Sequence, residues 1–149
     1  MARLPAPSAT YVFRDSWHVP ARPEDVHATL LDVERYVEWW PQVVAVGYLG
    51  PTEGLVLCRS TLPYVLELVM REVCRDPDRL EVAVSGDLEG TVRFGLSAEG
   101  SGTRLSLHQE VEVRGFLALA SRLGRPLLTW NHDRMMRGCV DGLTARLAG

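Results

Sequence analysis

One side chain capable of acid–base chemistry stands among apolar neighbours: His132, in the segment "TWNHDRMMRGCVDGL" of residues 129–143. On a helix that turns about 100° per residue, six apolar or thiol side chains lie within about 60° of this imidazole: Leu128, Met135, Met136, Cys139, Leu143 and Leu147. Such a histidine has two interpretations. It bonds to a backbone carbonyl or a strand side chain, or it offers a hydrogen bond or a proton to an oxygen of a bound ligand.

Three further polar residues are candidates because of the strands in which they lie. Gln109 joins the inward-facing apolar set of its strand as a polar exception. Asp15 lies on the inward face of the first strand, but it equally suits a bulge or an ion pair with an arginine at the sheet rim. Arg59 lies in a segment with apolar residues on both faces. If it points inward, it anchors a ligand carboxylate or enolate; if Cys58 and Ser60 point inward instead, it is a solvated charge.

Tryptophan and methionine residues offer candidates for the walls of a pocket. Trp39 and Trp40 are adjacent on a predicted helix and point in different directions, so we expect one in the core and the other at a cavity mouth. Met70, Met135 and Met136 suit ordinary packing, and they equally suit the adaptable lining of a pocket that accepts several shapes.

The composition excludes several classes of function. The net charge of −3 gives no electrostatic case for nucleic-acid binding, which normally needs a basic surface. No run reaches the 18 or so apolar residues of a membrane span, so we expect no stable membrane insertion. The start, "MARLPAPSA", lacks the apolar stretch of a signal peptide. We therefore expect residues 1–9 to be a flexible lead-in and the protein to be cytoplasmic.

Common cofactor and catalytic motifs are missing as well. The three cysteines are widely spaced and the four histidines are scattered, so we expect no metal site. All 16 basic residues are arginine, which rules out a Schiff-base lysine and a P-loop lysine. The chain also has no G-x-S-x-G elbow and no Rossmann glycine pattern.

The residue pattern predicts a single domain over residues 1–149. Residues 10–20 alternate as a half-buried strand, and residues 21–42 carry two short helical patterns. From Val43 to Arg114 the period is two, broken by turn formers, which predicts six further strands with short connections. The chain then turns helical, with a short piece ended by Gly124 and a long helix from Pro126 to about Leu147.

This order favours an α+β fold, in which a seven-stranded antiparallel sheet curves around the long C-terminal helix. A curled sheet that grips one helix leaves space between them, and that space can form a pocket. The residues that we expect to contact a ligand there come from strands, from the second short helix and from the last helix: Trp17, Trp40, Leu68, Met70, Val84, Phe94, Gln109, Leu128, His132, Met135 and Met136.

Four stretches of the sequence, in this order of elements, are similar to a known family: "VERYVEWWPQV", "SGDLEG", "GTRLSL" and "WNHDRMMRGCVDGL". From about Tyr11 onward the chain resembles the START-like (SRPBCC) helix-grip superfamily, and within it the polyketide cyclase/dehydrase-like proteins of bacteria. The resemblance implies a deep, mostly apolar cavity between the sheet and the C-terminal helix. It also implies a lipophilic or aromatic ligand, no metal and no obligatory cofactor. Of the polar residues that catalytic members use, only those of the helix motif around His132 can be matched here.

Three functions follow as hypotheses. The first is binding of a small hydrophobic or aromatic molecule, polyketide-like or lipid-like, in the internal cavity. The second is catalysis as an aromatase/cyclase or dehydratase, with His132 as acid or base and Arg59 or Gln109 stabilising enolate charge. The third is a protein-interaction module. The sequence leaves open whether the chain is a monomer or a homodimer.

Three structural outcomes distinguish these hypotheses. A carrier predicts an almost wholly apolar cavity in which His132 is tied to the protein. An enzyme predicts at least two convergent polar side chains with unused hydrogen-bonding capacity in the pocket. An interaction module predicts a collapsed cavity and a large exposed apolar patch.

Overall fold

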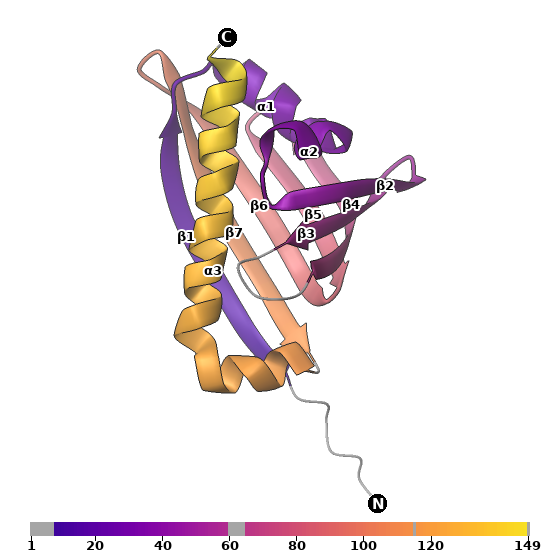
Figure 1. Ribbon diagram of the computed structural model, residues 1–149. Helices are drawn as coiled ribbons and strands as arrows, with labels where there is room; N and C mark the ends of the chain where they lie inside the picture. The colour runs from indigo at the N-terminus through magenta and orange to yellow at the C-terminus, as the bar shows by residue number, and fades with distance from the viewer. Residues whose placement is uncertain (1–7, 60–64, 115, 149) are drawn as a thin grey trace, which may run out of the picture.

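The computed structural model describes residues 8–59, 65–114 and 116–148. The predicted order of one strand, two short helices, six strands and a final helix is confirmed (Figure 1). In chain order, with η1 marking a short 3-10 helix, the elements are β1 (Ser8–Val19), α1 (Pro23–Leu31), η1 (Val33–Arg35), α2 (Tyr36–Trp39), β2 (Val43–Gly50), β3 (Glu53–Arg59), β4 (Val65–Asp76), β5 (Arg79–Gly86), β6 (Leu88–Glu99), β7 (Gly102–Arg114) and α3 (Phe116–Leu147).

The start of the chain differs in part from the sequence expectation. The flexible lead-in was expected over residues 1–9, of which residues 1–7 lie outside the described part. Ser8 and Ala9 already belong to β1, where they pair with Arg114 and Val113 of β7. The long ladder between β1 and β7 therefore begins earlier than the apolar alternation indicates.

All seven strands form one antiparallel sheet, in the order β1-β7-β6-β5-β4-β3-β2. From β2 to β7, each strand pairs antiparallel with the next strand along the chain. Strand β1 closes the order by pairing with β7 from Ser8↔Arg114 to Val19↔Thr103. Figure 1 shows α3 running along β1 and β7, with α1 and α2 near the end of the sheet where the C-terminus lies.

Helix α3 consists of two pieces, as the sequence predicts. Gly124 has a non-helical backbone (φ −142°, ψ 39°), and Pro126 follows two residues later. Proline lacks the N–H that would continue the helical ladder, and it disfavours the helical conformation in the residue before it. The long piece therefore starts in a new direction, and Figure 1 shows the bend.

The C-terminal half of α3 packs tightly against the rest of the protein. Cys139 and Leu143 are fully buried. A Cβ atom at Gly142 would collide with the backbone carbonyl of Trp39, and one at Gly138 with the side-chain amide of Gln42. The two glycines thus allow the helix backbone to approach α2 and the segment that follows it.

Candidate ligand-binding cavity

A cavity of about 540 Å³ lies between the sheet and α3. Its helical wall comes from the part of α3 that precedes the tightly packed half, at Leu128, Asn131, His132, Met135 and Met136. Ten of the eleven residues predicted to contact a ligand line it: Trp40, Leu68, Met70, Val84, Phe94, Gln109, Leu128, His132, Met135 and Met136. The volume is in the usual range of small-molecule sites.

Trp17, the eleventh residue, does not line the cavity, so this prediction is wrong. Its ring is partly buried and packs against the core. The reason lies in its register on β1, where it is opposite Leu105, a fully buried residue of β7. At this end of the β1–β7 pair the core closes over the sheet, and the cavity opens only farther along the same strands.

Strands β3 and β4 carry apolar residues on both faces, and their pairing shows which face points inward. Val56 pairs with Leu68 and Cys58 with Leu66, and all four side chains are buried. Cys58 lines the cavity, and burial raises the pKa of its thiol to about 11. Arg59 is exposed on the opposite face. The expectation that Arg59 anchors a ligand or stabilises an enolate inside the cavity is therefore wrong, whereas its alternative as a solvated charge is confirmed. Ser60 lies outside the described residues.

Asp15 also stays out of the cavity lining. It is exposed, and its carboxylate accepts a hydrogen bond of 2.8 Å from the backbone N–H of Ser16. It still affects the cavity through its charge, which favours the protonated form of His132.

His132 is fixed by two contacts from the sheet. Its Nε2 donates to the side-chain Oε1 of Gln109 on β7 at 3.0 Å. Its ring stacks on Phe13 of β1, with the centroids 3.6 Å apart and the planes 11° apart. The interpretation in which a strand side chain satisfies the histidine is thus correct for one of its two nitrogens.

The other nitrogen, Nδ1, is buried and has no hydrogen-bond partner among the described residues. Because the Gln109 oxygen can only accept, Nε2 carries the hydrogen and Nδ1 presents a lone pair. Burial lowers the pKa of His132 to about 4, an effect that the charge of Asp15 partly opposes. The ring is therefore neutral at pH 7, and Nδ1 is an acceptor of hydrogen bonds.

Tyr11 adds a second buried polar group to the same wall. Its ring lies beside Phe13, with the centroids 5.8 Å apart and the planes 10° apart. The residue is 3% exposed, and its hydroxyl has no partner within the described part of the chain. The guanidinium of Arg125 lies 4.2 Å from the centroid of the Tyr11 ring and donates to the Thr10 carbonyl. Alternation along β1 placed Tyr11 inward, but no sequence signal marked its hydroxyl as unpartnered.

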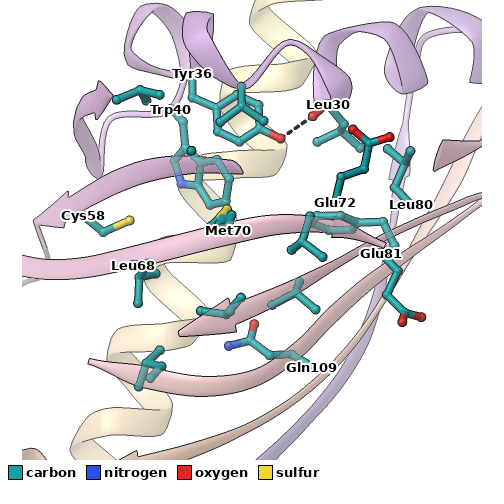
Figure 2. A pocket seen from close by; sticks show the side chains of 18 of the residues that line it. Leu30, Tyr36, Trp40, Cys58, Leu68, Met70, Glu72, Leu80, Glu81 and Gln109 are labelled. Carbon is teal, nitrogen blue, oxygen red and sulfur yellow. Dashed lines mark hydrogen bonds between the residues drawn. The ribbon is translucent and has the colours of Figure 1, made fainter. Parts of the chain in front are cut away.

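The opposite side of the cavity is closed by aromatic rings. Figure 2 shows Tyr36 and Trp40 on one side and Gln109 on the other. The Tyr36 hydroxyl donates to the Leu30 carbonyl, and the Trp40 indole N–H donates to the Met135 carbonyl at 3.0 Å. These bonds hold the chain segment of α1 and α2 against the cavity and against α3. Of the two adjacent tryptophans, Trp40 lines the cavity, whereas both are largely buried.

Acidic residues line the cavity on its solvent side. Asp32, Glu34 and Glu53 are exposed lining residues, and we call this region the mouth. The half-buried Glu72 and Glu81 line the cavity as well. Glu72 extends from β4 toward Leu30 and forms an ion pair of 3.5 Å with the exposed Arg75 (Figure 2). No arginine is among the described residues that line the cavity. The lining is therefore apolar in its body and negative at its mouth.

Two kinds of feature are absent from the residues that the structure describes. No helix there has the length and hydropathy needed to cross a membrane. No three His, Cys, Asp or Glu side chains in that part of the chain are grouped so that they could hold a metal ion.

Comparison with known proteins assigns the fold and the family. No curated protein matches the sequence. Among solved structures, the chain is similar to a START superfamily protein from Mycobacterium smegmatis, with a TM-score of 0.76, 16% identity, and coverage of 92% of this chain and 97% of that one. It is also similar to the Zhui aromatase/cyclase from Streptomyces sp. R1128, with a TM-score of 0.73, 14% identity and 94% of each chain covered.

Identities this low establish the fold alone. The family is established by its model, described as polyketide cyclase / dehydrase and lipid transport, which matches residues 19–138. The chain belongs to this polyketide cyclase / dehydrase and lipid transport family and has its START-like fold.

Proposed function

We propose that the protein binds a small hydrophobic or aromatic molecule in the cavity between its sheet and α3. The observation that carries this proposal is the cavity of about 540 Å³, whose walls are mostly apolar and contain few polar groups. Each 100 Å² of apolar ligand surface buried there contributes about 2.5 kcal/mol before the cost of association. Affinity therefore comes from the apolar body of the ligand, and the polar groups fix its orientation.

Catalysis as a cyclase or dehydratase is the second candidate, and one observation favours it. The His132 Nδ1 and the Tyr11 hydroxyl both have unused hydrogen-bonding capacity and both belong to residues lining the cavity. However, Arg59 lies outside, and the lowered pKa of His132 makes it a weak base that is not protonated at pH 7. Binding is therefore the function that the site supports best. An open cavity also argues against a pure interaction module, which requires a collapsed one.

Binding can be tested with a fluorescent probe and two matched variants. N-phenyl-1-naphthylamine is uncharged and brightens in apolar surroundings. Val92→Trp places an indole inside the cavity, whereas Val73→Trp places the same indole on an exposed position of β4, where valine is 52% exposed. We expect probe binding to the natural protein and to Val73→Trp, and at least tenfold weaker binding to Val92→Trp.

Circular dichroism and thermal unfolding would establish that both variants are folded. Equal binding of the probe to both tryptophan variants would place the binding site elsewhere and contradict the proposal.

For the catalytic alternative, turnover of a poly-ketone substrate that is unchanged in His132→Gln would remove His132 from the mechanism.

A further inference from the structure

A second hollow, of about 530 Å³, lies on the outer face of the sheet, away from the cavity. Arg14 of β1 is opposite His108 of β7, which on its other side is opposite Arg93 of β6. The next pair along these strands is Ser106 and Gly95. All five residues line this hollow and none of them lines the cavity, so we call it the outer hollow.

A glycine makes the depression. A Cβ atom at Gly95 would lie 2.4 Å from the hydroxyl oxygen of Ser106, so a larger residue would fill the space over β6. On its other side Gly95 is opposite Arg79 of β5, which also lines the outer hollow. Arginines from three strands, Arg14, Arg79 and Arg93, therefore surround one small depression in the sheet surface.

The polar side chains of the outer hollow mainly donate hydrogen bonds. The guanidinium of Arg93 donates to Nδ1 of His108 at 3.3 Å. Nδ1 therefore holds a lone pair, and Nε2 of the same ring carries the hydrogen. A guanidinium has five N–H donors and no acceptor, so most of the donors of Arg14 and Arg93 remain free for a ligand.

These arginines lack the carboxylate partners that other arginines of the protein have. Arg22, Arg35 and Arg104 each form an ion pair with a nearby acid. Neither the exposed Arg14 nor the half-buried Arg93 does so within the part of the chain that the structure describes. Free guanidinium groups gathered at a depression favour a bound anion.

The acids near the outer hollow do not cancel its charge. Asp15 belongs to the inner face of β1, because it is opposite the buried Leu107. Asp78 lies in the exposed turn before β5, and Glu81 is opposite Arg93. Neither of these two forms an ion pair with another described residue. Three arginines against two carboxylates leave an excess of positive charge.

We propose that the outer hollow binds the phosphate group of a small phosphorylated molecule. Arg14 and Arg93 lie on either side of His108, with their backbones about 10 Å apart, which is two strand spacings. A carboxylate has two oxygens, which one guanidinium can satisfy. A phosphate monoester has three strongly accepting oxygens and up to two negative charges, so it can accept from both arginines at once.

The outer hollow suits a small molecule better than a protein partner. Its volume is in the range of small-molecule sites. The one large apolar residue among its described lining residues is Leu107, whose side chain is buried. A protein interface normally has an apolar centre, which this surface does not offer. The site is independent of the function proposed for the cavity.

The test is a titration of the isotope-labelled protein, followed by its amide chemical shifts, at pH 7.5 and constant ionic strength set with sodium chloride. The probes are inorganic phosphate, methyl phosphate, acetate and a glycine-rich peptide that contains one phosphoserine. We expect both small phosphates to shift the amides of Arg93 and His108 saturably. We expect acetate to bind at least tenfold more weakly, because it engages one guanidinium in place of two.

Two variants that remove the same charge locate the site. Arg93→Gln should weaken phosphate binding at least tenfold, because it removes a charge-assisted hydrogen bond. Arg71→Gln is the matched control, since Arg71 is an exposed residue of β4 that does not line the outer hollow. It should change phosphate binding less than twofold. Both variants should be folded by circular dichroism and should bind N-phenyl-1-naphthylamine like the natural protein.

Four outcomes would overturn the inference. Absence of saturable phosphate binding would remove the site, and it would leave the function of the cavity untouched. Equal weakening by both variants would show only a general attraction of anions to the protein surface. Acetate binding as tight as that of phosphate would remove the preference for a phosphate group. Binding of the peptide at least tenfold more tightly than methyl phosphate would assign the phosphate to a protein partner.

Discussion

The lowered pKa of His132 predicts that the stability of the protein falls in mild acid. Burial disfavours the imidazolium, so the native pKa is about 4, whereas the unfolded chain has the ordinary value near 6.5. As the pH falls below 6.5, the unfolded state takes up a proton that the native state does not. The free energy of unfolding therefore decreases between pH 6.5 and pH 4, and it levels off below pH 4 as far as this group is concerned.

The size of the effect follows from the two pKa values. At pH 5 the histidine of the unfolded chain is almost fully protonated, and that of the native protein is protonated in about a tenth of the molecules. Integration of the linkage relation from pH 7 to pH 5 gives a loss of about 2 kcal/mol from this one residue. Asp15, whose charge favours the imidazolium, already reduces the shift on which this value is based.

The assay is urea unfolding of the natural protein and of His132→Gln at pH 7 and pH 5, followed by circular dichroism. Glutamine does not titrate, so all other groups cancel when the two proteins are compared at each pH. We expect the stability difference between them to shift by about 2 kcal/mol in favour of His132→Gln on going to pH 5. A stability difference that is the same at both pH values would refute the claim that His132 is held neutral by burial.

Three further predictions test the packing around the cavity. Gly142→Ala should lower the free energy of unfolding by about 1–3 kcal/mol, because its methyl group would collide with the backbone carbonyl of Trp39. Gly138→Ala should lower it clearly less, because its methyl group meets only the flexible side chain of Gln42. Urea unfolding measures both. Leu143→Ala should cost about 2–5 kcal/mol, because it removes a fully buried side chain, again measured by urea unfolding. Iodoacetamide at pH 8 should label Cys74 before Cys58, because burial raises the pKa of the Cys58 thiol to about 11; peptide mass spectrometry over time gives the order.

Much of the fold could be predicted because strands and helices carry different periods. The alternation in β5 to β7 placed Val84, Phe94 and Gln109 inward, and the structure confirms them in the cavity lining. The break in α3 could be read from Gly124 and Pro126, since both residues disfavour a continuous helix.

The orientation of Arg59 could not be read in the same way. Leu55 and Leu57 on the outer face of β3 are as apolar as Val56 on its inner face, so the pattern has no polar side. The pairing of Val56 with Leu68 and of Cys58 with Leu66, all four of them buried, shows which residues point inward. Register depends on strands that lie far apart in sequence, and a single strand with two apolar faces does not specify it.

Trp17 shows a second limit. Alternation correctly placed it on the inner face of β1, but the inner face includes both closed core and cavity wall. Which of the two a residue meets depends on where α3 approaches the sheet, and that is set by contacts such as Gly142 against Trp39. The sequence period shows which face of the sheet a residue of a strand lies on. It does not show how far that face is from the helix that covers the sheet.

The two halves of α3 explain how one helix can both complete the core and leave a cavity beside the sheet. Its C-terminal half is drawn close to α2 by glycines, while its earlier part meets the sheet through the stacked rings of His132 and Phe13. The same two residues, Phe13 and His132, also line the cavity. We therefore expect a substitution at His132 to affect stability and ligand binding together, whereas a substitution at the acidic mouth should mainly change the preference for ligand charge.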